Sequence, residues 1–280
     1  MKKLLIVGMG LIGGSIAKAS KGFFENIYAY SQSASTILIA EADGVIDKGF
    51  SNIESLPRDI DLVCLCTPVS NIVPIAEQLY AFLDKGALFT DAGSTKLGIV
   101  EEMRQREIPF VGGHPMAGKE RSGYAASSKE LFINANWVLT PCNNDNGIEQ
   151  LHLWVEYMGA RAIVMDASDH DIAAAAISHL PHIAASALTE IAAGVERDCP
   201  EVRLLAAGGF LDITRIASSD PLMWQNIFLN NKEPVLTMLS KMQAILKDWQ
   251  EMISNADADA LLKRFEATKK VRDSYKKENK

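Results

Sequence analysis

Polar and titratable side chains follow three apolar runs in the first half of the sequence. Thr67-Pro68 follows LVCLC, residues 91–96 (DAGSTK) follow ALFT, and residues 112–118 (GGHPMAG) follow PFV. A histidine flanked by glycines and a proline, such as His114, is suited to general acid–base work at neutral pH. Ligands of open parallel sheets bind beyond the carboxyl ends of the strands. We therefore predict that the three segments meet at one site, with His114 as the base in a loop after a strand.

A glycine-rich turn near the start of the chain predicts where a dinucleotide binds. Gly8, Gly10 and Gly13 follow the first apolar run and open a helical pattern, the context that a G-x-G-x-x-G motif requires. The first glycine makes the tight turn, the second admits the diphosphate, and the third packs helix on strand. The helix N-terminus, at Leu11 and Ile12, offers free N–H groups and a positive dipole end. The cofactor we predict is NAD or NADP.

The end of the second predicted strand bears on the choice between these cofactors. An acidic residue there bonds the ribose 2′-OH in NAD-binding proteins, but this strand, IYAY, ends in Ser31-Gln32-Ser33. The missing carboxylate removes the repulsion of a 2′-phosphate, while no arginine stands nearby to bind one. We lean slightly towards NADP, with Ser31, Thr67 and Pro68 as further cofactor-binding residues.

Both residues that we assign to catalysis have a structural alternative. His114 could be a satisfied structural histidine, but its setting at a strand end favours the catalytic role. Ser94 could be the N-cap of a helix that starts at Thr95. Its functional alternative is a hydroxyl that orients His114 or bonds substrate and nicotinamide.

Further candidates lie in the later, helical part of the sequence. His179 and His182 stand three residues apart on one helical face and could contact substrate or a metal. No third ligand with fitting spacing appears nearby, so we predict no metal. Arg215, at the end of GGFLDITR, suits a bidentate carboxylate clamp. Trp224, in DPLMW, is either a buried aromatic at a helix start or a substrate contact.

The other histidines and the cysteines receive no chemical role. His152 lies in the helical segment LHLWVEYMG, and His170, in SDHD, is typical of a helix start. The cysteines lack metal-site spacing and are predicted to be reduced thiols. They are Cys64, Cys66, Cys142 and Cys199.

The elements that must position these residues suggest two domains. Short apolar runs alternate with helical patterns up to Met165, as in βαβ units of a mostly parallel sheet, and long Ala-rich helices follow. We predict an α/β fold: a Rossmann-like dinucleotide-binding domain over 1–165 and an all-α substrate and dimerisation domain over 166–280. Predicted strands are 3–7, 26–30, 61–66, 87–90, 109–111, 137–140 and 161–165, and predicted helices of the second domain are 168–197, 200–217, 221–255 and 257 onward.

The amino-acid composition and net charge exclude some classes of binding partner. The 280 residues are 48% hydrophobic and 22% charged, as in an ordinary globular protein, and the net charge is -7. Nucleic-acid binding needs a basic surface, so none is predicted. The apolar start of the chain is interrupted by glycines and shows no cleavage site. We predict a cytoplasmic protein with no targeting segment and no membrane span.

Taken together, six ordered motifs resemble the prephenate/arogenate dehydrogenase family over nearly the whole chain. They are GxGxxGxS at Gly8 to Ser15, DxGSTK at Asp91 to Lys96, GGHPMAG at Gly112 to Gly118, SHLPH at Ser178 to His182, GFxDxTRI at Gly209 to Ile216, and DPxMW at Asp220 to Trp224.

The resemblance implies an activity, a partner and residue roles. The family oxidatively decarboxylates prephenate, or its amino analogue arogenate, in tyrosine biosynthesis, and pairs two subunits through the helical domain. By this likeness His114 accepts a hydrogen bond from the C4 hydroxyl of the substrate, with Ser94 orienting the group. Arg215 holds a substrate carboxylate, and His182, with His179, borders the side-chain end of the pocket.

The chain departs from the family at Leu211, where many members carry Lys or Arg, so one anionic contact is in doubt. From the resemblance we expect neither the regulatory domain that some relatives append nor a chorismate mutase segment. Any inhibition by tyrosine is then expected at the active site.

Two other functions remain as alternatives. Another two-domain dehydrogenase of β-hydroxyacids would share the glycine turn, but such enzymes generally use a lysine in the helical domain, and none stands between Arg161 and Lys232. A non-catalytic, nucleotide-sensing regulator would not need the set of Ser94, His114 and Arg215.

Overall fold

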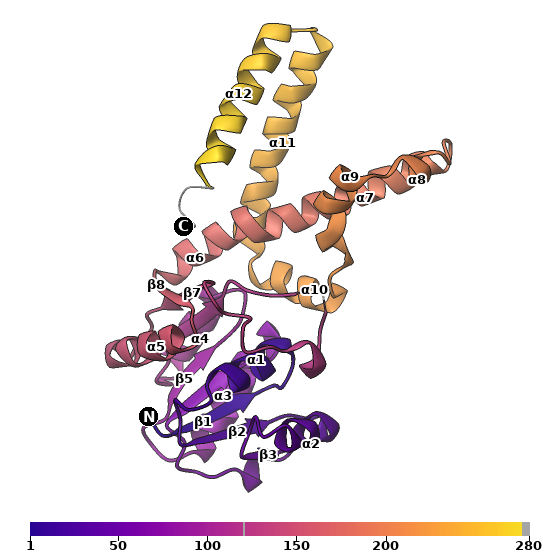
Figure 1. Ribbon diagram of the computed structural model, residues 1–280. Helices are drawn as coiled ribbons and strands as arrows, with labels where there is room; N and C mark the ends of the chain where they lie inside the picture. The colour runs from indigo at the N-terminus through magenta and orange to yellow at the C-terminus, as the bar shows by residue number, and fades with distance from the viewer. Residues whose placement is uncertain (120, 276–280) are drawn as a thin grey trace. The chain divides into compact units, whose positions relative to one another are not determined.

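The computed structural model describes residues 1–119 and 121–275. The chain forms two compact units, Met1–Lys232 and Glu233–Lys280. The first unit contains all the described strands and every candidate site residue, and Figure 1 shows its sheets in purple to pink.

A five-stranded parallel sheet forms the base of the first unit, in the order β3-β2-β1-β4-β5. The fold class predicted from the alternating pattern is confirmed. The short strand β3 was not predicted, because its three residues (KGF) form no apolar run. The strands are β1 (Lys3–Val7), β2 (Asn26–Tyr30), β3 (Lys48–Phe50), β4 (Leu62–Leu65) and β5 (Leu88–Asp91).

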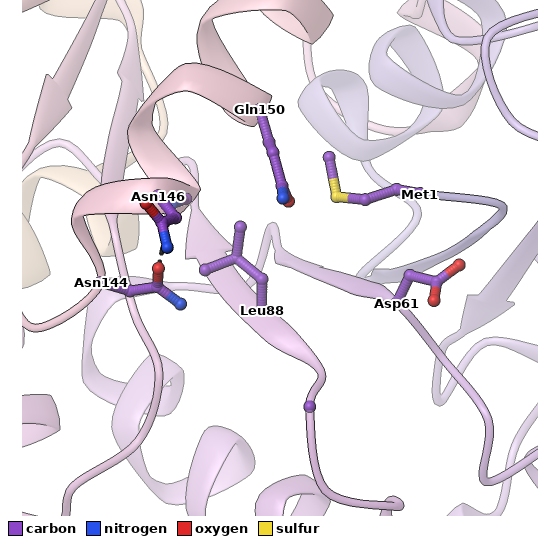
Figure 2. Close-up of a pocket in the computed structure, with 8 residues that line it drawn as sticks. Met1, Asp61, Leu88, Asn144, Asn146 and Gln150 are labelled. Atoms are coloured by element: carbon purple, nitrogen blue, oxygen red, sulfur yellow. Dashed lines mark hydrogen bonds between the residues drawn. The ribbon is translucent and has the colours of Figure 1, made fainter.

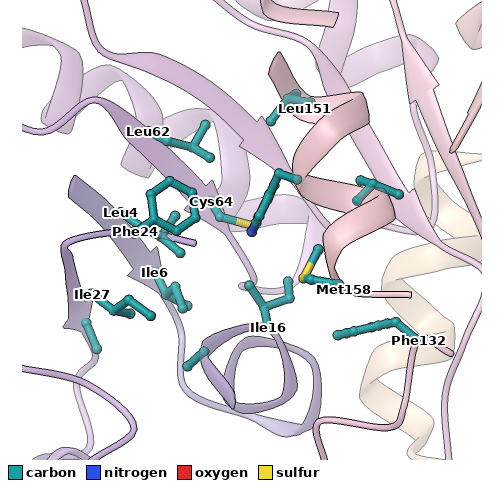
Figure 3. Packing of buried hydrophobic residues seen from close by; sticks show 14 of the residues in the cluster. Leu4, Ile6, Ile16, Phe24, Ile27, Leu62, Cys64, Phe132, Leu151 and Met158 are labelled. Carbon is teal, nitrogen blue, oxygen red and sulfur yellow. The ribbon is translucent and has the colours of Figure 1, made fainter. Parts of the chain in front are cut away.

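Both faces of this sheet are covered, as the continuous apolar runs required. Successive residues of β1 alternate between two hydrophobic clusters: Leu4 and Ile6 pack in one, and Leu5 and Val7 pack in the other. Figure 3 shows the first cluster, where Leu4 and Ile6 lie among side chains from neighbouring elements. The helices and turns that follow the strands are α1 (Leu11–Ala19), α2 (Ala34–Ala42), η1 (Ile53–Ser55), α3 (Val69–Phe82) and α4 (Leu97–Gln105).

A second, three-stranded sheet carries His114. Its order is β6-β7-β8, with β6 antiparallel and β8 parallel to β7. The prediction of a strand at 109–111 was wrong: only Phe110 bridges to β5, and the strand lies at Gly112–Pro115. His114 is therefore a strand residue and not a loop residue. The elements are β6 (Gly112–Pro115), η2 (Tyr124–Ala126), β7 (Asn136–Thr140), α5 (Asp145–Tyr157) and β8 (Arg161–Val164).

Glycines explain why the strand begins where the apolar run ends. A Cβ on Gly113 would lie 2.4 Å from the carbonyl oxygen of Asp91, and one on Gly112 would lie 2.1 Å from Thr140 Oγ1. The sequence GG permits this close approach of β6 to β5 and β7, which larger residues would prevent.

The helical part of the first unit starts with a continuous helix of three segments. A π-helical turn (Ala175–His179) joins α6 (Ala167–Ala174) to α7 (Leu180–Glu196). Pro181 explains the turn, because proline has no N–H to donate to the carbonyl four residues earlier. The predicted helix 200–217 is divided, and the predicted helix 221–255 is broken at Asn231. The elements are α8 (Val202–Leu205), α9 (Gly208–Thr214), η4 (Arg215–Ser218) and α10 (Pro221–Asn230).

The helix over Ala167–Glu196 has the length and hydropathy of a membrane-spanning segment, and 28% of its most apolar window is buried. Core helices of globular proteins can share this length and hydropathy, although they are mostly buried. Its exposed apolar side chains include Ile177 and Ile191.

The second unit is a pair of helices, α11 (Lys232–Ser254) and α12 (Ala258–Ser274). The rings of Trp249 and Phe265 lie 4.9 Å apart, and Arg264 lies over the Trp249 ring. Asp257 accepts a hydrogen bond from Ala260 N and so caps α12. These contacts hold the two helices together.

Candidate active site

His114 is the first member of a buried hydrogen-bond chain. Its Nδ1 lies 2.8 Å from His170 Nε2, and His170 Nδ1 lies 2.8 Å from Asp171 Oδ1. A carboxylate only accepts hydrogen bonds, so the hydrogen of His170 must be on Nδ1. Nε2 of His170 is then an acceptor, so the hydrogen of His114 must be on its own Nδ1. Nε2 of His114 then keeps its lone pair, which is the form that a general base requires. We refer to these three residues as the base cluster.

The carboxylate of Asp171 also caps the N-terminus of a helix. It accepts hydrogen bonds from Lys96 N at 2.7 Å and Leu97 N at 2.9 Å, at the start of α4. The cap on α4 is thus supplied by α6 and not by Ser94, so the alternative role of Ser94 as an N-cap was wrong. The same contact fixes the position of Asp171 behind His170.

A buried ion pair lies beside the base cluster. Lys96 Nζ donates to Asp91 Oδ2, and both side chains are fully buried. Asp91 also accepts from Gly113 N at 2.9 Å, next to His114, and from Gly93 N at 2.8 Å. The pair thereby fixes the end of β5 against β6. Burial lowers the pKa of Lys96, while the carboxylate of Asp91 opposes this shift.

The surroundings keep His114 neutral. Burial lowers its pKa well below the usual value, and the nearby His170, Lys96 and His179 lower it further. A neutral imidazole is ready to accept a proton over the whole physiological range of pH.

The glycine turn has the geometry of a diphosphate cradle. Gly8 has φ of +93°, and a Cβ on Gly13 would lie 1.9 Å from the carbonyl oxygen of Gly8, so neither position tolerates a side chain. Gly10 is the N-cap of α1, and nothing lies within 4 Å of a Cβ built there. The first N–H groups of α1 therefore face open space, as a phosphate would require.

A pocket of about 430 Å³ opens beside this turn. Thr67 Oγ1, in the pocket wall, is buried and has no hydrogen-bond partner among the described residues, so a ligand group could satisfy it. Ser94 also lies in the wall, and the hydrogen-bond partner of His114 is His170 rather than Ser94, so the Ser94 hydroxyl could bond substrate or nicotinamide. The pocket is lined by Gly10, Leu11, Ile12, Cys66, Thr67, Pro68, Val69, Ala92, Gly93, Ser94, Lys119, Arg121, Ser122, Gly123, Ser219, Asp220, Leu222, Met223, Asn226 and Ile227.

Other predicted residues lie outside the pocket wall. Ser31 follows β2, whose last carbonyl, on Tyr30, accepts from Gly8 N at 2.8 Å, so Ser31 stands next to the glycine turn. Arg215 is exposed at the start of η4, four residues before Ser219 of the pocket wall. The wall also leaves out Gly8, Gly13, His114, His179, His182 and Trp224.

His179, His182 and Trp224 form a second cluster, which we call the ring cluster. The rings of His182 and Trp224 are stacked, with centroids 3.7 Å apart. Three buried ring nitrogens have no hydrogen-bond partner among the described residues: His179 Nε2, His182 Nδ1 and Trp224 Nε1. Burial lowers the pKa of His179 to about 4 and also lowers that of His182. Neutral rings with unused nitrogens suit contact with polar groups of a ligand.

Sequence reasoning missed His170 and Asp171. His170 does lie in the first half of α6, as predicted, but it is 2% exposed and bonded to His114. The only available signal in the sequence was the adjacent pair His170-Asp171, a few residues after the last predicted strand. Lys119 and Arg121 of the pocket wall were also missed.

A second pocket lies at the opposite end of the parallel strands (Figure 2). It is about 400 Å³ and contains Leu88 at the start of β5 and Asp61 before β4. Its described lining residues include no histidine, lysine or arginine, so it offers no counterpart to the base cluster. They are Met1, Asp61, Gly86, Leu88, Asn144, Asn146, Gly147 and Gln150.

Comparison with known proteins agrees with this arrangement. Residues 15–164 match the family described as "Prephenate dehydrogenase, nucleotide-binding domain", and residues 166–267 match "Prephenate dehydrogenase, dimerization domain". A prephenate dehydrogenase from Lactococcus lactis is 37% identical, over 97% of this chain and 77% of that protein.

Two solved structures share the fold over almost their full length. Prephenate dehydrogenase from Aquifex aeolicus, in complex with hydroxyphenyl propionate and NAD+, has a TM-score of 0.91 at 35% identity, covering 98% of each chain. Arogenate dehydrogenase from Synechocystis has a TM-score of 0.86 at 31% identity, covering 98% of this chain and 99% of that one. From the matched domains and these relatives, the chain belongs to the prephenate dehydrogenase family.

Proposed function

We propose that this chain oxidises and decarboxylates prephenate to 4-hydroxyphenylpyruvate in tyrosine biosynthesis, passing a hydride to NAD or NADP. The hydrogen-bond chain from Asp171 through His170 to His114 carries this proposal, because it leaves Nε2 of His114 as a proton acceptor. The glycine turn beside the pocket supports dinucleotide binding.

The reaction needs one proton acceptor and one hydride acceptor. Nε2 of His114 takes the proton of the C4 hydroxyl as hydride leaves C4, and a nicotinamide held at the glycine turn would accept that hydride. The bond between C1 and its carboxylate breaks, CO2 leaves, and the electron pair of that bond enters the ring. The ring becomes aromatic, which makes the reaction strongly favourable, and the phenolate oxygen takes the proton back from His114 to give the hydroxyl of the product.

The base cluster favours this proton transfer in two ways. Asp171 holds His170 in the tautomer that accepts from His114, so His114 presents Nε2 in its basic form. When His114 gains a proton, its Nδ1–H keeps donating to His170 Nε2, so the ring stays fixed through the proton transfer. Asp91, at the end of β5, accepts from Lys96 Nζ and from Gly113 N, which holds β6 beside β5 and fixes the position of His114.

The remaining roles follow the geometry and the family motifs. Ser94 bonds the substrate hydroxyl or the nicotinamide from the pocket wall. The ring cluster borders the side-chain end of the substrate, and Arg215 holds a carboxylate. The cofactor is held by Gly8, Gly10, Leu11, Ile12, Gly13, Ser31, Thr67 and Pro68.

We further propose a slight preference for NADP over NAD, since Ser31 replaces the acid that selects NAD. The domain boundary at 165/166, a homodimer formed through the helical domain and a cytoplasmic location belong to the same proposal. The exposed apolar side chains of α7 and α12, such as Ile191 and Phe265, support the homodimer.

Arogenate is the second candidate substrate, because a structural relative at 31% identity is an arogenate dehydrogenase. The two substrates differ only in their side chain, which is pyruvyl in prephenate and alanyl in arogenate. The unpartnered nitrogens of the ring cluster could form hydrogen bonds with either side chain.

A spectrophotometric assay of the purified protein with prephenate or arogenate, each with NAD or NADP, tests the proposal. We expect reduced nicotinamide with prephenate, and faster formation with NADP than with NAD. No reduced nicotinamide in any of the four mixtures would refute the function. Turnover of arogenate alone would replace the substrate and keep the mechanism.

A further inference from the structure

The segment between β6 and β7 is tied to the helix that begins at the glycine turn. We call residues 116–119 and 121–128 the strap. Ser15 Oγ, in α1, accepts from Ser128 N at 3.0 Å. Lys18 Nζ, one turn further along α1, donates to the carbonyl oxygen of Ser127 at 3.0 Å and to its hydroxyl at 2.8 Å. The far half of the strap is therefore fixed to α1.

Packing reinforces this attachment. A Cβ on Gly14 would lie 2.8 Å from Ser127 Oγ and 2.8 Å from Tyr124 Cδ2, so this glycine makes room for the strap. Tyr124 donates to Asp43 Oδ2 at 2.9 Å, and burial together with this hydrogen bond raises the pKa of Tyr124 to about 12. Lys18 Nζ also lies 4.6 Å from the centre of the Tyr124 ring.

The near half of the strap forms part of the pocket wall at the glycine turn. Lys119, Arg121 and Gly123 line the pocket together with Gly10 and Leu11. Since the far half is anchored on α1, the near half crosses close to the N-terminus of the same helix. Arg121 therefore lines the same pocket as the N-terminus of α1, where a phosphate would bind.

The charges in the pocket wall favour Arg121 as the phosphate partner. Among the described lining residues the cations are Lys119 and Arg121, and the acid is Asp220, which caps α10 through Met223 N. Lys119 Nζ reaches back to the carbonyl oxygen of Ala126, within the strap. Arg121 has no hydrogen-bond or ion-pair partner in the described part of the chain.

A diphosphate needs such a cation here. The end of a helix supplies only about half an elementary positive charge, whereas a diphosphate bridge carries about two negative charges at neutral pH. The chain as a whole is acidic, with a net charge of -7, so it provides no general positive field. A guanidinium can bond two phosphate oxygens at once.

We propose that Arg121 is a phosphate-binding residue, held by the strap over the N-terminus of α1 to pair with the diphosphate of the dinucleotide. The proposal rests on the proposed function in one respect, namely that the pocket at the glycine turn takes a dinucleotide.

The test is calorimetric binding of ADP-ribose, NAD+ and NADP+ to the purified full chain and its Arg121→Ala, Arg121→Lys and Lys129→Ala variants. ADP-ribose keeps the diphosphate and lacks the nicotinamide, so its binding reports on phosphate recognition without catalysis. We expect Arg121→Ala to raise all three Kd values by roughly tenfold or more, the usual effect of losing a hydrogen bond to a charged group. Arg121→Lys should restore part of the affinity.

Lys129→Ala is the matched control, since it also removes one positive charge just beyond the strap but from an exposed side chain outside the pocket wall. We expect its Kd values to stay within about twofold of wild type. Circular dichroism spectra and melting temperatures of all variants exclude unfolding as the cause.

Three results would overturn the assignment. Unchanged Kd values in Arg121→Ala would show that Arg121 does not touch the dinucleotide. Weaker binding of NADP+ alone would place Arg121 at the 2′-phosphate, and a raised KM for substrate with unchanged cofactor binding would place it at a substrate carboxylate. A chain that binds ADP-ribose through Arg121 but turns over neither prephenate nor arogenate would refute the proposed reaction and leave this assignment standing.

Discussion

The base cluster and the ring cluster contain similar residues but differ in how their polar atoms are bonded. In the base cluster, each contact from His114 to His170 and from His170 to Asp171 is a hydrogen bond of 2.8 Å. In the ring cluster, one nitrogen of each ring, on His179, His182 and Trp224, is buried without a partner among the described residues.

The two clusters are joined through one side chain. Asn231 Nδ2 donates to the backbone carbonyl of Asp171 at 2.9 Å and lies 3.1 Å from His179 Nδ1. The difference between the clusters therefore does not come from separate environments. On the proposed assignment, the proton-accepting side of the site makes its hydrogen bonds within the chain, whereas the substrate side leaves buried nitrogens that a ligand could satisfy.

Removal of the base tests the role of the base cluster most strongly. We predict that His114→Asn lowers kcat by about 10²- to 10⁴-fold, the usual contribution of a positioned acid–base group. The Kd for the cofactor should stay near wild type, because His114 does not line the pocket at the glycine turn. A loss of less than about threefold in kcat would remove His114 from its role.

The pH dependence of kcat/KM tests whether the pKa of His114 is lowered in the buried site. A base whose pKa is near the usual value of about 6.5 would lose activity between about pH 6 and 7. Burial, with smaller contributions from His170, Lys96 and His179, places the pKa of His114 well below that value. Activity should therefore persist as the pH falls through 6 and decline only at lower pH, as His114 becomes protonated. A decline centred at pH 7 or above would contradict the buried site.

Asp171→Asn tests whether the hydrogen-bond chain acts as a unit. An amide can no longer accept from His170 and from both N–H groups of α4, so His170 loses its fixed tautomer. We expect kcat to fall by about 10- to 1000-fold with little change in KM, as for residues that orient a catalytic histidine. The melting temperature should also fall. A variant that loses stability but keeps wild-type kcat at permissive temperature would limit Asp171 to a structural role.

Arg215→Ala addresses the incomplete, ligand-binding side of the site. If Arg215 holds the substrate carboxylate without help from Leu211, its loss removes roughly 2–4 kcal/mol of charge-assisted bonding, and KM for prephenate should rise by about 30-fold or more. Arg215→Lys should recover part of this, because an ammonium lacks the planar fork.

Leu211→Lys is the complementary change, since Leu211 is exposed one helical turn before Arg215. The added cation should lower KM for prephenate. Normal binding of prephenate by Arg215→Ala would show that the carboxylate is held elsewhere and that the GFxDxTRI motif is structural.

The smallest expected effect concerns cofactor choice. Ser31 stands next to the glycine turn, where a carboxylate would repel a 2′-phosphate. We predict that Ser31→Asp raises KM for NADP by about tenfold or more and spares or improves that for NAD. Equal effects on the two cofactors would show that Ser31 does not contact the ribose.

Sequence patterns predicted the elements whose residues interact locally. The glycine turn, β1 and α1 follow from Gly8, Gly10 and Gly13, because glycine requirements and apolar runs are properties of neighbouring residues. The pairing of His170 with His114 could not be predicted in this way, since 56 positions separate them. The strand β6 was placed wrongly for a related reason. Gly112 and Gly113 are needed there because Asp91 and Thr140, which are distant in the sequence, approach them closely.

We propose that His114 accepts the proton in an oxidation coupled to decarboxylation. The most direct measurement is the ratio of CO2 released to nicotinamide reduced, followed in one reaction of the purified chain with prephenate. We predict a ratio of one to one for the wild type, and loss of both products together in His114→Asn. Reduced nicotinamide without CO2, or a His114→Asn variant that forms both products at the wild-type rate, would contradict the account.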